Sequence, residues 1–92
     1  MTALPESLTL SDATECLETL RQAFQADAAP VFRIDASPLR QLDSAAVAVL
    51  LECRRLAAAA KREIEVIGAP PKLVELAKLY GVETLIGAMP AA

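Results

Sequence analysis

Segments with a strand pattern and segments with a helix pattern alternate along this chain, and this alternation restricts its fold more than any other feature. The strand-like segments are short and contain mainly aliphatic and β-branched residues, whereas apolar residues in the segments between them recur at helical spacing. The strand-like segments are residues 7–10, 31–36 and 63–67, and helix-like segments begin near residues 12, 45 and 71. The alternation predicts a small α/β domain with a mostly parallel sheet flanked by helices.

Local signals mark where the first and last helices begin and where the last helix ends. Ser11 and Asp12 are typical N-cap residues, and Asp12 and Glu15 have the spacing of a capping box. Pro71 stands at the tolerated first position of the last helix, and Gly81 fits a left-handed C-cap. The apolar stripe of that last helix is predicted to comprise Leu73, Leu76, Ala77 and Tyr80.

The chain has 92 residues, a length that fits one domain. We expect an N-terminal lead of residues 1–6, a domain over residues 7–86 whose last element (82–86) is a strand or a short helix, and a tail of residues 87–92. The longest unbroken apolar run, Ala45–Leu51, is too short to span a bilayer, and the first residues lack the pattern of a secretory signal. We therefore expect a cytoplasmic protein without direct insertion into a membrane.

The composition argues against several classes of function. The chain has no His, so it lacks the commonest general base and the commonest metal ligand, and its net charge of −3 offers no basic surface for nucleic acid. Ser44 has no His to activate it, and Val47 stands where a Ser-x-x-Lys arrangement would need a lysine. Cys16 and Cys53 are predicted to be free, buried residues of helices. We therefore expect no catalytic residue, no cofactor and no metal.

The candidate site lies where the longest helix, about residues 45–61, begins. In parallel α/β folds, functional residues gather at the carboxyl ends of strands and the amino ends of the following helices, which here means the loop 36–42 and Asp43-Ser44. The free N–H groups of a helix start would stabilise a phosphoryl group on Ser44. Alternatively, the bare Ser44 hydroxyl packs against a partner, or Asp43 or Ser44 is only an N-cap.

Small apolar residues follow directly. Ala45, Ala46 and Val47 would let the backbone of a partner approach closely if they are exposed, and would be ordinary core residues if they are not. The predicted partner-binding residues are therefore Asp43, Ser44, Ala45, Ala46 and Val47, with Ser44 as a possible phosphorylation site.

These residues resemble those of a known family. The segment Asp35–Leu51 is similar to the core of a STAS domain, in which a strand ending in Asp-Ala-Ser leads through a loop to Asp-Ser at a helix start. The segment Leu76–Val82, Leu-Ala-Lys-Leu-Tyr-Gly-Val, is similar to the third helix of the MlaB-type STAS proteins of Gram-negative bacteria. The resemblance covers about residues 7–86.

The resemblance implies a single STAS-like domain with a four- or five-stranded sheet flanked by helices. It also implies a non-enzymatic cytoplasmic subunit that binds the ATPase subunit of a phospholipid-transporting ABC complex, through which it would be peripheral to the inner membrane. Such complexes maintain the lipid asymmetry of the outer membrane. Ser44 matches the family hydroxyl position that lies at the ATPase interface, and Asp43 matches the acid that precedes it in the family. The alternative is an anti-sigma factor antagonist or a chemotaxis-associated STAS protein that is switched by phosphorylation at Ser44.

The sequence departs from the family pattern in two places. Anti-sigma factor antagonists usually carry a glycine after the Asp-Ser element, whereas Ala45-Ala46 follows Ser44 here, which argues more against the phosphorylation switch than against docking. The opening hairpin is reduced to Leu8–Leu10, so we expect an exposed sheet edge.

Overall fold

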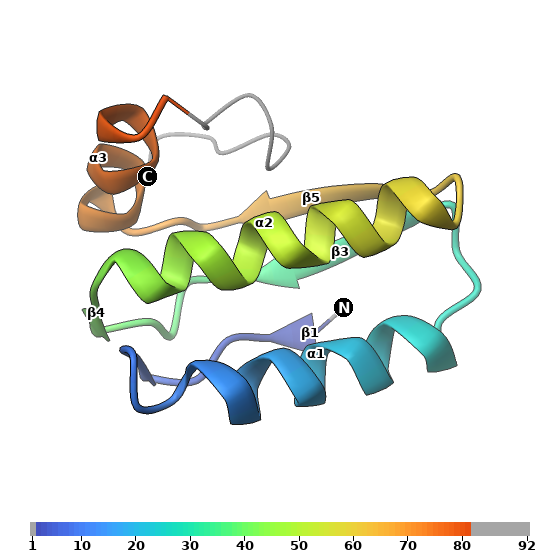
Figure 1. Ribbon diagram of the computed structural model, residues 1–92, viewed down its shortest axis with the longest axis horizontal. Helices are drawn as coiled ribbons and strands as arrows, with labels where there is room; N and C mark the ends of the chain where they lie inside the picture. The colour runs from blue at the N-terminus through green and yellow to red at the C-terminus, as the bar shows by residue number, and fades with distance from the viewer. Residues whose placement is uncertain (1, 82–92) are drawn as a thin grey trace.

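The computed structural model describes residues 2–81, so the predicted last element (82–86) and the tail (87–92) lie outside the described residues. The predicted strands and helices follow one another in the predicted order, and two further two-residue strands lie among them (Figure 1). The helices are α1 (Ala13–Ala26), α2 (Ser44–Ala59) and α3 (Pro71–Leu79). The strands are β1 (Thr2–Ala3), β2 (Ser7–Leu8), β3 (Val31–Asp35), β4 (Gln41–Leu42) and β5 (Glu63–Ile67).

All strand pairs in this part of the chain are parallel, as predicted. They form a three-stranded sheet in the order β1-β3-β5 and a two-stranded sheet of β2 and β4. The five strands are therefore divided between two small sheets rather than joined in one. Sequence analysis assigned 36–42 to a loop, but Gln41 and Leu42 form β4, because the Gln41 N–H donates to the Glu6 carbonyl at 2.9 Å and β2 pairs alongside.

The predicted N-terminal lead is not separate from the domain. Thr2 and Ala3 pair with Ile34 and Asp35, and the Leu4 N–H donates to the Asp35 carbonyl at 2.8 Å. The Leu4 side chain is only 2% exposed and belongs to the core. The lead therefore supplies both an edge strand and a core side chain, which corrects the boundary expected at residue 7.

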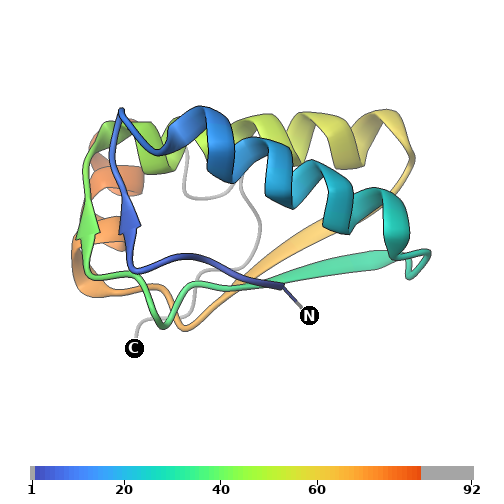
Figure 2. The same cartoon turned by 90° about the horizontal axis from the view of Figure 1, so that it is seen from below.

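The sheet is covered by α1 and α2 on one face, as Figure 2 shows. Because side chains alternate along a strand, β3 and β5 send one set of residues towards these helices and the other set away. The set facing the helices is buried and comprises Phe32, Ile34, Ile64 and Val66. The opposite face carries an ion pair between Arg33 Nε and Glu65 Oε1 at 3.3 Å. This polar face explains why the strands alternate in character instead of being apolar throughout.

The start of α1 differs from the prediction. Asp12 precedes the helix, but its backbone is helical (φ −98°, ψ −13°) and its side chain makes no capping bond. Its Oδ2 instead accepts hydrogen bonds from the Thr9 N–H at 3.0 Å, the Ser7 hydroxyl at 2.8 Å and the Thr9 hydroxyl at 3.0 Å. These donors lower the pKa of Asp12, the Thr9 N–H most of all. A capping side chain needs an extended backbone, so the capping-box prediction was wrong.

The boundaries of α3 agree with the sequence signals. One residue of its predicted apolar stripe, Tyr80, is exposed. Pro71 begins the helix, and Gly81 follows its end with φ +67°, a conformation that favours glycine. Leu73 and Ala77 are buried, whereas Tyr80 is 55% exposed. Tyr80 is the C-cap residue and follows Leu79, the last residue of the helix.

Arg62 connects the end of α1 to the start of β5. Its Nη1 donates to the Phe24 carbonyl at 2.8 Å and its Nε donates to the Ala29 carbonyl at 2.7 Å. The guanidinium lies 4.0 Å from the centre of the Phe24 ring, which in turn meets Phe32 edge-on at 5.4 Å. One side chain thus donates to one carbonyl in the last turn of α1 and to another beyond the helix, and it covers the aromatic end of the core.

We expect Arg62→Ala to lower the free energy of unfolding by about 1–3 kcal/mol, because it removes two hydrogen bonds and a cation–π contact. Arg55→Ala is the matched control: it removes an exposed ion pair with Glu52 and should cost no more than about 1 kcal/mol. Urea denaturation of both variants measures the difference. If both variants lose the same free energy of unfolding, Arg62 contributes no more to stability than a surface arginine.

Candidate partner-binding site

Asp43 organises the start of α2. Its backbone is extended and its Oδ1 accepts a hydrogen bond from the Ala45 N–H at 2.8 Å, so it is the N-cap of the helix. Its other oxygen, Oδ2, accepts from the Leu10 N–H at 3.2 Å. A single carboxylate therefore joins the start of α2 to the turn that precedes α1, although 33 residues separate the two positions.

The structure divides the five predicted partner-binding residues into two groups. Asp43 and Ser44 are exposed, whereas Ala45, Ala46 and Val47 are 8%, 0% and 3% exposed. Ala46 and Val47 belong to the core and cannot present a surface to a partner in this structure, which corrects the predicted extent of the site. The physical reason is that α2 contacts α1, α3 and β5, so its first turns are surrounded on several sides.

An apolar depression nevertheless lies beside Ser44. It has a volume of about 370 Å³ and is lined by residues of α1, the turn before it and the start of α2. These residues are Leu10, Ala13, Asp43, Ser44, Ala45 and Ala48. Apart from Leu10, the side chains are short, so a partner could approach the two helices closely here. We call this the tip surface.

Three residues of the tip surface, Leu10, Ala13 and Ala48, were not among the predicted partner-binding residues, and Leu10 is the largest of them. It was assigned to the first strand, but that strand ends at Leu8, and Leu10 lies 79% exposed in the turn before α1. A leucine among Thr9, Ser11 and Asp12 was the available signal, because turns of this kind rarely need an apolar residue.

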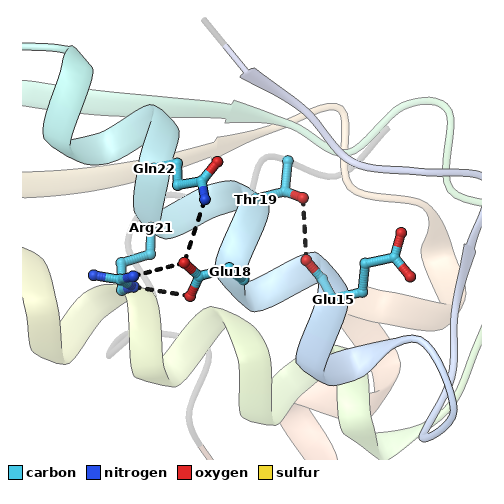
Figure 3. A network of polar contacts seen from close by, with 5 residues as sticks. All are labelled: Glu15, Glu18, Thr19, Arg21 and Gln22. Atoms are coloured by element: carbon cyan, nitrogen blue, oxygen red, sulfur yellow. Dashed lines mark hydrogen bonds and ion pairs between the residues drawn. The ribbon is translucent and has the colours of Figure 1, made fainter.

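The middle of α1 presents a different kind of surface. Glu18 accepts hydrogen bonds from Arg21 and from Gln22, and the Thr19 hydroxyl donates to the Glu15 carbonyl at 3.1 Å (Figure 3). These polar groups pair with one another along the outer side of the helix. This part of α1 is therefore a solvated face, and the apolar contact area is limited to its N-terminal end.

The two thiols are buried and unreactive in character. Burial raises the pKa of Cys53 to about 12 and also raises the pKa of Cys16. Both are free and belong to the core, as predicted. A nucleophilic cysteine needs a lowered pKa, so neither thiol is prepared for chemistry.

Residues 2–81 contain neither a group of side chains suited to hold a metal ion nor a helix long and apolar enough to cross a membrane. The features gathered at the tip surface are an exposed hydroxyl, a capping carboxylate and apolar side chains.

A parallel α/β domain in which β3 is followed by the short strand β4 and then by Asp-Ser at a helix start is consistent with a STAS domain. A family model described as "Mlab, STAS domain" matches residues 3–87. The chain therefore belongs to the MlaB-type STAS domain family, and the match begins at Ala3 of β1 and includes β2. No functionally curated protein matches the chain.

The different surroundings of Ala46 and Ala48 can be tested by replacing each of them with leucine. We expect Ala46→Leu to lower the free energy of unfolding by about 1–3 kcal/mol, because extra methylene groups do not fit a close-packed core. Ala48→Leu, on the exposed side of the same helix turn, should change it by less than about 0.5 kcal/mol. Urea denaturation measures both. A tolerated Ala46→Leu would place Ala46 at the surface after all.

Proposed function

We propose that this protein is a non-enzymatic STAS subunit that binds the ATPase subunit of a phospholipid-transporting ABC complex. In this role it would act in the cytoplasm, peripheral to the inner membrane through its partner, and would help to maintain the lipid asymmetry of the outer membrane. The match to the MlaB-type family over residues 3–87 is the observation that carries the proposal.

The tip surface supports a docking role. Ser44 and Ala48 have short side chains and are exposed, so a partner can contact the backbone of α2 without having to displace bulky groups. The fixed cap at Asp43 keeps this helix start in one conformation, which lowers the conformational entropy lost on binding. A docked subunit can favour the assembled state of an ATPase only by binding that state more tightly than the others.

Regulation by phosphorylation at Ser44 is the second candidate function, because the Ser44 residue is exposed at a helix N-terminus. The position of Asp43 argues against it. The Asp43 carboxylate already pairs with the Ala45 N–H, which is one of the groups that would receive the phosphate. Two negative groups would then compete for the same end of the helix.

Docking through the tip surface predicts that Ser44→Arg raises the Kd for the ATPase subunit at least about tenfold, equivalent to about 1.4 kcal/mol. The long charged side chain would fill the depression, but it points away from the core, so the free energy of unfolding should stay within about 0.5 kcal/mol. Calorimetric titration measures the Kd, and ATP hydrolysis by the reconstituted transporter provides a second readout.

Ala58→Arg is the control for this experiment, because Ala58 is exposed near the other end of α2 and does not line the depression. This variant should bind the ATPase subunit with the native Kd and have the same effect on ATP hydrolysis as the native chain. If the native chain neither binds the ATPase subunit nor changes the stability or activity of the transporter, the proposed function is wrong.

The phosphorylation alternative makes a separate prediction. Protein isolated from cells should then include a species heavier by one phosphoryl group, and Ser44→Ala should abolish that species. Intact-mass spectrometry across growth conditions provides the measurement. A chain that stays unmodified in every condition would eliminate the switch and leave docking as the role of Ser44.

A further inference from the structure

We infer that Leu10 is the anchoring side chain of the tip surface and that Asp43 is the positioning residue that holds Leu10 there. The inference rests on the proposed function, because the partner that receives Leu10 is the ATPase subunit. Beyond the proposed function, it specifies which residue inserts into the partner and how the protein holds this residue in place before the partner binds.

The side chain of Leu10 is exposed, whereas its backbone is held by hydrogen bonds. The side chain is 79% exposed, the largest exposed fraction among the exposed large apolar residues of the described chain. Its N–H donates to Asp43 Oδ2 at 3.2 Å, and its carbonyl accepts from the Ala13 N–H at 3.4 Å. The Asp12 carboxylate also holds the neighbouring Thr9 through both its N–H and its hydroxyl. A side chain on such a fixed turn loses little backbone entropy when a partner binds it.

The surroundings of Leu10 indicate the chemistry of the surface that fits it. Asp43 is the single charged residue that lines the depression, and both of its oxygens already accept hydrogen bonds from backbone N–H groups. The remaining lining is apolar or hydroxyl-bearing. The matching surface of the ATPase subunit therefore has an apolar socket for Leu10 and, beside it, an apolar side chain that enters the hollow over Ala13 and Ala48.

Two of the exposed large apolar residues lie elsewhere and provide a comparison. Leu79 is 75% exposed at the end of α3, and Tyr80 follows it. Neither lines the depression beside Ser44. Leu79 therefore matches Leu10 in type and exposure while differing in place, so Leu79→Ala is the control for Leu10→Ala.

Asp43→Asn separates the two functions of Asp43. Its amide has one oxygen, which can accept from the Ala45 N–H and keep the helix cap, since Asn is as good an N-cap as Asp. The second position then carries an NH₂ group, which cannot accept a hydrogen bond from the Leu10 N–H. We expect the urea midpoint of this variant to remain near the native value while the turn containing Leu10 is released.

The experiment uses the full chain and the ATPase subunit of the phospholipid transporter from the same organism. Calorimetric titration should give Leu10→Ala a Kd at least about tenfold higher than the native value, as expected for a hot-spot residue. Leu79→Ala should bind as the native chain does. Without the partner, hydrogen exchange at the Leu10 amide should be several-fold faster in Asp43→Asn than in the native chain, and the Kd of this variant should lie between those of the native chain and Leu10→Ala.

Each result decides a different point. If the native chain binds but Leu10→Ala binds as tightly as Leu79→Ala, the anchor role is wrong and the proposed function stands. If exchange at the Leu10 amide is the same in Asp43→Asn, the positioning role of Asp43 is wrong. If the native chain does not bind the ATPase subunit, the proposed function fails and the anchor role fails with it, while the exchange measurement still decides whether Asp43 holds Leu10.

Discussion

The close approach of α2 to its neighbours is the constraint on which the rest of the structure depends. This helix contacts α1, α3 and β5, and its buried residues include alanines as well as larger aliphatic residues such as Val49 and Leu50. Ala46 and Ala57 of α2 and Ala77 of α3 are at most 1% exposed. Short side chains let helix axes approach one another closely. They also explain why the start of α2 looks from its composition like a binding surface although half of it is core.

The sequence predicts the longer elements well and the shortest ones poorly, for a physical reason. Strands β3 and β5 and the three helices have enough residues for their periodicity to be visible, and Pro71 and Gly81 act locally at the ends of α3. The two-residue strands β1 and β4 exist because of pairing with distant segments, which no local pattern encodes. The Asp12 capping box failed for a similar reason: donors in the preceding turn outcompeted the helix for its carboxylate.

At the candidate site, too, the features set by neighbouring residues could be predicted, whereas those set by the packing of distant elements could not. The position of Asp43-Ser44 at a helix start follows from local chemistry, and both residues are exposed as a docking role requires. Whether Ala46 faces a partner or the core depends on how α1 and α3 pack around α2, so the sequence left both alternatives open. The sequence gives no sign that Leu10 lies beside Asp43, because the hydrogen bond between them spans 33 residues of chain.

The parallel pairing of the strands also has a kinetic consequence. In every strand pair of residues 2–81 the partners are 32 to 34 positions apart, so a whole helix must be spanned before any pair can form. Without a local hairpin to nucleate the sheet, chain-closure entropy opposes the first contacts and slows folding relative to a helical bundle of similar size. During synthesis, β1 therefore has to wait for β3 to leave the ribosome. Until then, α1 is the element of the nascent chain that is able to form on its own.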